Sequence, residues 1–198
     1  MIRELDIALF RLINGQWAHT WLDGLASALQ HPWWLWPPVA VLAAWLLIKG
    51  GRKGRVFVLT LAAAVIATDV FCAQILKPLI ARPRPCVELE GVRALLGVKK
   101  SWSMPSNHAA NTAAAAFVIG AFYRRWIVPA IAVVLVVGFT RIYLGVHYPL
   151  DILLGWAMGA VIAALALTVQ ERLIERQPHE EKDKNPKSSK RIDVSKTA

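Results

Sequence analysis

The sequence predicts an all-α membrane protein, a polytopic bundle of five or six transmembrane helices preceded by an N-terminal interfacial helix. Hydrophobic residues make up 56% of the 198 residues, and only 18% are charged. Mean hydropathy is +0.44, and the chain contains nine Trp, a residue enriched at membrane interfaces. A composition this apolar places nearly the whole chain in one bundle within a bilayer.

The positive charge of the chain fits membrane topology better than a nucleic-acid partner. The formal net charge is +10, but the Lys and Arg residues lie in short loops between apolar runs and near the C-terminus. No basic stripe with interleaved aromatic residues lies outside these runs, so we predict no nucleic-acid binding. The N-terminus carries mixed charge without a long apolar segment after it, which predicts insertion through internal helices rather than a cleaved signal.

Residues 4–14 form the first predicted element. Leu5, Leu9, Leu12 and Ile13 fall on one face at helical spacing, in a segment too short to cross a bilayer. Two interpretations stay open: an amphipathic helix that lies in the membrane interface, or a helix packed on the end of the bundle.

Five apolar stretches follow and predict the transmembrane helices. A hydrocarbon core of about 30 Å needs about 20 helical residues, so the shorter stretches extend into their flanking residues. The predicted spans are residues 30–48, 56–76, 107–123, 127–146 and 150–169. Gly155 and Gly159 have the small-xxx-small spacing of closely packed helices, a pattern that is weak by itself. One domain then covers residues 1–177, and the polar residues 178–198 predict a disordered cytoplasmic tail.

The short basic loops predict which ends of the helices face the cytoplasm. Basic residues cluster at 49–55 and at Arg124 and Arg125, and such loops stay cytoplasmic under the positive-inside rule. Segments 77–108 and 141–151 then lie together on the extracytoplasmic face. Segment 77–108 is itself basic, and a function for its cations would explain this exception.

Three segments on this face place ionisable residues beside apolar spans, where such residues are costly without a function. They are residues 77–85, residues 105–108 and residues 141–151. Together they offer cations that can bind an anion, two histidines and a carboxylate. This combination indicates phosphoryl transfer at a membrane surface.

In the first two segments, each candidate anion ligand has a structural alternative. Lys77, Arg82 and Arg84 can cradle phosphate oxygens, or they can anchor the second span by snorkelling to the interface. Ser106 and Asn107 begin a predicted helix, where backbone N–H groups and a hydroxyl favour an anion. The alternative for both residues is an ordinary N-cap.

The third segment combines a cation with a histidine and a carboxylate. Arg141 lies late in an apolar span and requires an anionic partner, from the protein or from a ligand. Asp151 follows Pro149 in the first turn of a helix and can reach His147, which fixes the ring tautomer and makes the other ring nitrogen a better nucleophile. A tie between two helices is the alternative.

A metal site is a weaker interpretation of the same residues. His108, His147 and Asp151 could ligate zinc, but the surrounding cations would repel it. Cys72 and Cys86 make no metal-binding pattern. We therefore predict no metal and no cofactor.

In this order, Lys-x6-Arg-Pro, Pro-Ser-x-His and Arg-x5-His-x3-Asp resemble the three signature motifs of the type 2 phosphatidic acid phosphatase (PAP2) superfamily. The match runs from Lys77 to Asp151, and the combined pattern is highly specific. The segment from Asp6 to Asn14, with Leu22–Asp23, more weakly resembles bacterial undecaprenyl-diphosphate phosphatases of this superfamily.

The resemblance implies a role for each matching residue. His147 attacks phosphorus and forms a phosphohistidine, Asp151 orients its ring, and His108 protonates the leaving oxygen and then activates water. No metal is required in this family. A neutral His147 and a protonated His108 predict a bell-shaped pH–rate curve. The residues implied to hold the phosphate are Lys77, Arg84, Ser106, Arg141 and the backbone of Asn107.

The implied substrate is a membrane lipid phosphate or diphosphate, with undecaprenyl diphosphate as the best match. Phosphatidylglycerophosphate, phosphatidate and lipid A 1-phosphate are alternatives, and a lipid or drug transporter with an anion site is the alternative from another class. The implied location is the bacterial inner membrane, with the site on the periplasmic face; the oligomeric state stays open. Asn107 replaces the family's usual Gly, and Thr140 replaces its usual Ser, which leaves substrate preference open.

Overall fold

The prediction of an all-helical chain is confirmed. The computed structural model describes residues 1–30, 33 and 36–184, and over these residues it contains helices and no strand. Short π-helical segments follow α1 and α4, at Leu12–Gln16 and Phe71–Leu76. The α-helices are α1 (Ile2–Arg11), α2 (Thr20–Gln30), α3 (Trp36–Lys49), α4 (Gly51–Val70), α5 (Lys77–Ile80), α6 (Pro85–Glu88), α7 (Asn107–Phe122), α8 (Ile127–Tyr143) and α9 (Pro149–Lys184).

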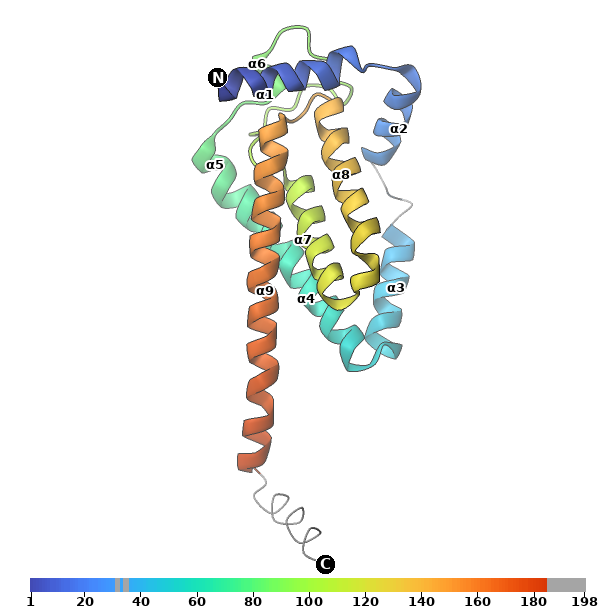
Figure 1. The fold of residues 1–198 in the computed structure, drawn as a ribbon, viewed down its shortest axis with the longest axis vertical. Helices are drawn as coiled ribbons and strands as arrows, with labels where there is room; N and C mark the ends of the chain where they lie inside the picture. Colours follow the sequence, from blue (N-terminus) through green and yellow to red (C-terminus); the bar gives the residue numbers. More distant parts are fainter. Residues whose placement is uncertain (31–32, 34–35, 185–198) are drawn as a thin grey trace, which may run out of the picture.

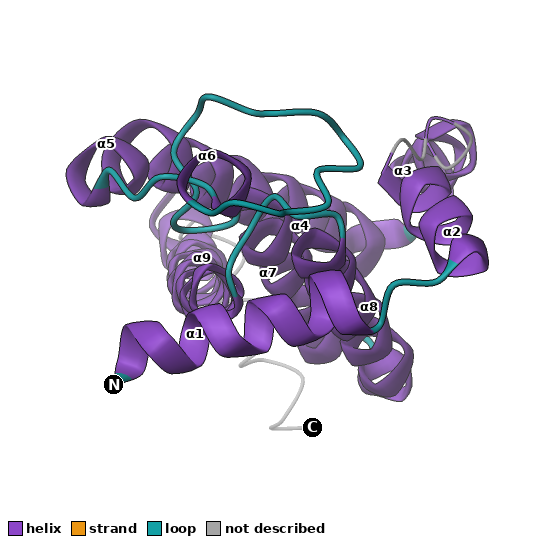
Figure 2. Cartoon of the chain, turned by 90° about the horizontal axis from the view of Figure 1, so that it is seen from above, coloured by secondary structure: helices purple, strands orange, loops and turns teal. Residues whose placement is uncertain are grey.

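The long helices α3, α4, α7, α8 and α9 run lengthwise in one bundle, and α1 lies across one end of it (Figures 1 and 2). The loop between α6 and α7 arches over the same end. The connections α3–α4 and α7–α8 lie at the opposite end. The three segments that carry the candidate residues therefore meet at one end of the bundle, as their order along the chain predicts.

Helix α7 packs against α4, α8 and α9. Its contact with α9 is close because glycines of α9 face the α7 backbone. A Cβ atom on Gly159 would lie 2.1 Å from the carbonyl oxygen of Ala110, and one on Gly155 would lie 2.8 Å from that of Ser106. The small-xxx-small spacing is thus a true helix-packing surface in this protein.

Helical segments of membrane-spanning length make this a membrane protein. Gly51–Glu88, Arg124–Tyr143 and Pro149–Ile174 are long and apolar enough to cross a bilayer. Helices α3 and α7, with 14 and 16 residues, measure about 21 Å and 24 Å at 1.5 Å per residue. The count of five or six spans remains a prediction, as do the domain limits.

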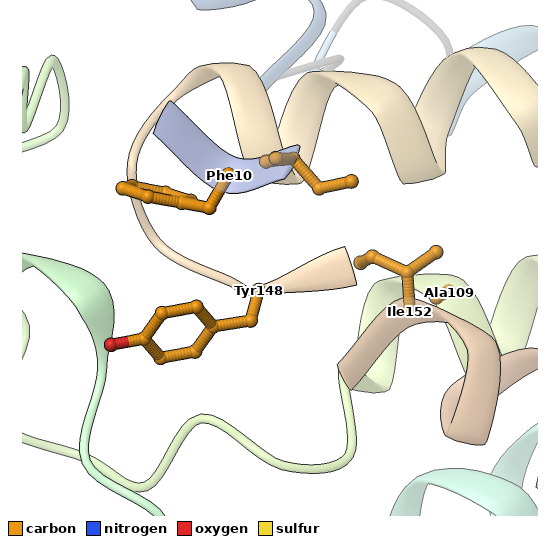
Figure 3. Packing of buried hydrophobic residues seen from close by; sticks show 5 residues of the cluster. Phe10, Ala109, Tyr148 and Ile152 are labelled. Atoms are coloured by element: carbon orange, nitrogen blue, oxygen red, sulfur yellow. The ribbon is translucent and has the colours of Figure 1, made fainter. Parts of the chain in front are cut away.

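Helix α1 combines features of both interpretations left open for it. Phe10 and Asp6 are buried against the bundle, and the Phe10 ring lies 5.5 Å from the Tyr148 ring. Figure 3 shows this cluster, in which Ile152 lies next to Ala109 and Phe10 lies on the side of Tyr148. On the predicted face, Leu5 and Leu9 are exposed, whereas Leu12 and Ile13 are half-buried. The helix therefore packs on the bundle through one face and leaves an apolar face outward.

The predicted span 30–48 is wrong in its first part. Gln30 ends α2, a separate helix that the hydropathy pattern did not predict, and the next long helix begins at Trp36. Pro37 and Pro38 fit only the first turn of a helix, because proline has no N–H to donate, so they favour a new start here. Residues 31, 32, 34 and 35 lie outside the described residues.

Two other helix ends differ from prediction. Helix α8 ends at Tyr143, short of the predicted residue 146, and Gly145 with φ +79° turns the chain there. Helix α9 continues to Lys184, into the predicted disordered tail. Glu, Arg and Lys favour helix, and extension of an existing helix is easier than nucleation. The remainder of that predicted tail, residues 185–198, lies outside the described residues.

Candidate active site

His147 lies in the turn between α8 and α9, buried between the carboxylate of Asp151 and the guanidinium of Arg84. Its Nδ1 lies 3.4 Å from Oδ2 of Asp151, and its Nε2 lies 3.2 Å from Nη1 of Arg84. A guanidinium only donates hydrogen bonds, so Nε2 accepts and the ring hydrogen lies on Nδ1, facing the carboxylate. The predicted nucleophile therefore presents a lone pair on Nε2.

Burial keeps this imidazole neutral. His147 is 3% exposed, and burial lowers its pKa to about 4, while its hydrogen bond to the Asp151 carboxylate opposes the shift. The nearby charges of Arg84 and Lys77 lower the pKa further. At physiological pH the ring is thus in the form that a nucleophile requires.

Arg84, at the start of α6, ties the first segment to the third. Its Nε and Nη2 donate to the carbonyl and hydroxyl of Ser101, at 2.8 and 3.1 Å. Its Nη1 also donates to the Val146 carbonyl at 2.8 Å. The side chain is 5% exposed, so its charge sits in a fixed position against the His147 ring.

Arg82 was left with two possible roles, binding phosphate or anchoring a span at the interface, and the structure shows a third arrangement. Instead of cradling a phosphate, its guanidinium bridges two carboxylates, Asp151 at 2.9 Å and Asp6 at 2.6 Å. It also lies 3.9 Å from the centre of the Tyr148 ring. Two arginines separated by one proline thus have different neighbours, which sequence spacing cannot distinguish.

Lys77, His108 and Arg141 lie close enough to His147 and Arg84 for their charges to interact. His108, in the first turn of α7, feels the charges of Arg141, His147 and Lys77, and Lys77 feels those of Arg84 and Asp151. The structure therefore brings the predicted residues of all three segments to one site.

Lys99 is a further cation at the site, which the sequence analysis included in the basic segment 77–108 without giving it a role of its own. It lies in the loop between α6 and α7, and its pKa is lowered by burial and then by the charges of Arg84 and Arg141. Its charge also acts on His108. No motif contains Lys99, so only the path of the loop reveals it.

Arg141 was expected to require an anionic partner. It is 3% exposed, and its Nη1 donates to the side-chain oxygen of Gln30, a neutral amide at the end of α2. Its Nε is buried without a partner among the described residues. The guanidinium therefore retains a donor and its full charge for an anion. Gln30 carried no sequence signal.

Ser106 occupies the N-cap position of α7, but its side chain makes no capping hydrogen bond. Its Oγ is buried without a partner in the part of the chain that the structure describes. Its backbone N–H donates to the Asp151 carbonyl at 3.0 Å, which links the second segment to the third. The hydroxyl fits an anion donor better than it fits the ordinary cap.

The two departures from the family pattern have structural explanations. The Asn107 side chain turns toward α4 and donates to Oδ1 of Asp69 at 2.8 Å, and Asn111 donates to the same atom at 2.9 Å. Thr140 donates within its own helix to the Val137 carbonyl at 2.8 Å. Asn107 therefore fastens the start of α7 to α4, and Thr140 makes only a local contact.

We expect Asn107→Gly to lower the free energy of unfolding by about 1–2 kcal/mol, because the Asp69 hydrogen bond is lost and backbone freedom increases. We also expect a severalfold higher KM, because the helix start that presents N–H groups to phosphate is less fixed. Asn111→Ala is the matched control, expected to lose similar stability with unchanged kinetics. Thermal unfolding in detergent and phosphate-release assays check both. A large loss of kcat in Asn107→Gly at unchanged stability would contradict this role.

The loop between α6 and α7 is fixed to the N-terminal elements by Arg93. Its guanidinium donates to Asp23 of α2 at 2.6 Å, and Asn14 accepts from its backbone N–H at 3.0 Å. Tyr143 at the end of α8 donates to Asp23 at 2.5 Å, and this bond, followed by that of Arg93, lowers the pKa of Asp23. These contacts explain why the loop that carries Lys99 stays over the site.

Both the sequence and the fold resemble those of known proteins. Residues 57–175 match the family model of the PAP2 superfamily. The chain is 31% identical to an undecaprenyl-diphosphatase of Sulfolobus acidocaldarius, over 83% of this chain and 78% of that protein. It is 28% identical to a lipid A 4'-phosphatase of Bacteroides thetaiotaomicron, over 88% and 81%. The crystal structure of Aquifex aeolicus LpxE matches with a TM-score of 0.64 and 28% identity, over 83% of this chain and 95% of that one. The chain belongs to the PAP2 superfamily of phosphatases.

Proposed function

We propose that this membrane phosphatase removes phosphate from a lipid diphosphate through a phosphohistidine at His147, with undecaprenyl diphosphate as its substrate. One observation carries the proposal: a buried neutral imidazole, oriented by Asp151, with its lone pair in a cluster of cations. This is the arrangement that nucleophilic catalysis at phosphorus requires.

In the first step, Nε2 of His147 forms a bond to the terminal phosphorus as the bond to the bridging oxygen breaks. His108 gives its proton to that oxygen, and undecaprenyl phosphate leaves. In the second step, water attacks the phosphohistidine and His108 takes a proton from it. Inorganic phosphate leaves, and both rings return to their starting states.

The cations of the site supply the charge stabilisation that this reaction needs. Lys77, Arg84 and Arg141 surround the position of the transferred phosphoryl group, and Ser106 and the helix start at Asn107 add donors. The cations near His108 disfavour its protonated form, and the negative charge of the bound substrate favours that form. A mechanism without a metal fits this cluster. Within the described residues, no group of three or more His, Cys, Asp or Glu side chains is placed to hold a metal ion.

A lipid substrate is supported by the surroundings of the site and by the names of the relatives. A groove between α2 and α8, of about 340 Å³, is lined by apolar side chains such as Leu25 and Phe139 and includes Thr140, next to Arg141. Polyprenyl and acyl chains match such a surface. The extracytoplasmic orientation, in the inner membrane of a bacterium, rests on the basic residues Arg52, Lys53, Arg124 and Arg125. They belong to the start of α4 and to the connection between α7 and α8, which lie at the end of the bundle away from α1 (Figure 1).

The direct test is phosphate release by purified protein from undecaprenyl diphosphate, phosphatidylglycerophosphate, phosphatidate and lipid A 1-phosphate, with and without EDTA and vanadate. We expect the highest kcat/KM with undecaprenyl diphosphate, no effect of EDTA, and inhibition by vanadate, which mimics the phosphoryl group. Preference for another lipid would overturn the substrate assignment alone. Loss of activity with EDTA would indicate a metal enzyme, and lipid transport without phosphate release would indicate a transporter.

A further inference from the structure

We propose that Asp6, on the N-terminal helix α1, is a positioning residue that orients His147 through Arg82 and Asp151. The inference rests on the proposed role of His147 and adds to it a part of the chain outside the three motifs. In the part of the chain that the structure describes, the Asp6 carboxylate accepts hydrogen bonds from Arg82 and Leu150, not from His147 or a residue proposed to bind phosphate. It acts through one guanidinium and one carboxylate.

The contacts form an unbroken sequence of charged groups. Oδ2 of Asp6 accepts from Nη2 of Arg82 at 2.6 Å, and Nη1 of Arg82 donates to Oδ1 of Asp151 at 2.9 Å. The other oxygen of Asp151 accepts from the backbone N–H of Tyr148 at 2.9 Å and lies 3.4 Å from Nδ1 of His147. Each oxygen of Asp151 therefore has a fixed partner, and its orientation toward His147 follows.

Burial makes these contacts strong. Asp6 is 2% exposed, Asp151 is 0% exposed, and the Arg82 side chain is 17% exposed. Charged groups in such positions are stable only when they are paired, and a guanidinium can donate to two carboxylates at once. Stacking on the Tyr148 ring at 3.9 Å fixes the plane of the Arg82 guanidinium.

Two further contacts hold helix α1 against the start of α9, beside Asp151. Oδ1 of Asp6 accepts from the backbone N–H of Leu150 at 2.9 Å, in the first turn of the helix that carries Asp151. Phe10, one turn later on α1, packs on Tyr148, as Figure 3 shows. The same carboxylate therefore contacts both Arg82 and the start of α9. A helix that only bound the membrane surface would need neither contact.

Substitution of Asp6 or Arg82 should change the pKa of His147 through the charged groups around its ring. Asp151 of α9, Arg84, Lys77 of α5 and His108 of α7 face the ring. Asp151 in turn faces Arg82. Removal of the negative charge of Asp6 disfavours the imidazolium, and removal of the positive charge of Arg82 favours it. The two substitutions should thus move the titration of His147 in opposite directions.

The experiment measures kcat, KM and the pH dependence of kcat/KM for Asp6→Asn and Arg82→Gln in the full-length protein, with undecaprenyl diphosphate. Both variants should lower kcat about 10-fold or more, because the nucleophile is less well oriented, with KM changed less than about threefold. The acid limb should move to lower pH in Asp6→Asn and to higher pH in Arg82→Gln. Arg82→Lys keeps the positive charge but cannot donate to Asp6 and Asp151 with the fixed geometry of a guanidinium. It should therefore lower kcat without moving the acid limb of the pH profile.

Arg3→Gln is the matched control on the same helix. Arg3 pairs with Glu88 at 2.5 Å, and the Arg3 side chain is 73% exposed. Glu88 also accepts from the Tyr148 hydroxyl at 2.7 Å, but the charge of Arg3 lies outside the ion pairs of Asp6, Arg82 and Asp151. Arg3→Gln should leave kcat and the acid limb unchanged. If Arg82→Gln does not fold, Asp6→Asn and Arg82→Lys still test the proposal.

Equal loss of activity in Arg3→Gln, or unmoved acid limbs in Asp6→Asn and Arg82→Gln, would show that α1 is only structural and overturn the inference. That outcome would leave the function of His147 intact. Full activity in His147→Ala would instead overturn the proposed function, so the two failures are distinguishable.

Discussion

His147→Ala is expected to lower lipid phosphate hydrolysis by at least about 10³-fold, because the atom that bonds to phosphorus is removed. Asp151→Asn should lower the rate about 10²–10⁴-fold, because an amide no longer fixes the ring tautomer. Quenched reactions with substrate labelled in the terminal phosphate should show an acid-labile, alkali-stable phosphoenzyme in the wild type. The label should be absent from His147→Ala.

His19→Gln is the control for this prediction. His19 lies just before α2, on the same end of the molecule, and its ring is near Trp21 rather than near the site. It should retain wild-type rate and labelling. Labelling of His147→Ala at the wild-type level, or labelling of another residue in the wild type, would contradict the assignment of the nucleophile.

Gly159→Val is expected to give the largest loss of stability, about 3 kcal/mol or more. A Cβ on this residue would lie 2.1 Å from the Ala110 carbonyl oxygen, and backbone cannot yield as a flexible side chain would. Helices α7 and α9 would have to separate, and these helices carry His108 and Asp151. Thermal unfolding in detergent should show a Tm far below that of the wild type.

Gly24→Val provides the comparison, because a Cβ on this glycine of α2 would meet nothing within 4 Å. It should change stability by less than about 1 kcal/mol. Gly155→Ala tests the link between this packing and the site, since its Cβ would press on the Ser106 carbonyl at 2.8 Å. We expect a greater loss of activity than of stability there. A wild-type Tm for Gly159→Val would mean that α7 and α9 do not pack this closely.

The motif residues show how far sequence reasoning can extend. Lys77, Ser106 and His147 come from different segments, yet their spacing relative to apolar spans predicts that they face the same side of a membrane. The structure places them together at one end of the bundle. Residues that act on them from elsewhere carried no such spacing, and Lys99 and Gln30 are examples.

The N-terminal segment shows the opposite case. Its hydropathy predicted an apolar face of leucines, but the contacts that matter come from its polar residues. Asp6 binds Arg82, Asn14 binds Arg93, and Asp23 binds both Arg93 and Tyr143. These are the residues on which the weaker resemblance to undecaprenyl-diphosphate phosphatases rests. Periodicity reports which faces avoid water, but it does not report which polar atoms pair across a fold.

By itself, the sequence determined the helical class, the membrane setting and the set of candidate site residues, because apolar run length and motif spacing are local properties of the chain. Only the tertiary structure decided that Arg82 supports a carboxylate while Arg84 faces the imidazole, and that α2 is separate from α3. Ion pairs between residues 6, 82 and 151 depend on how distant helices meet. That meeting is fixed by packing, such as the Gly159 contact with α7, and not by any neighbouring residues in the chain.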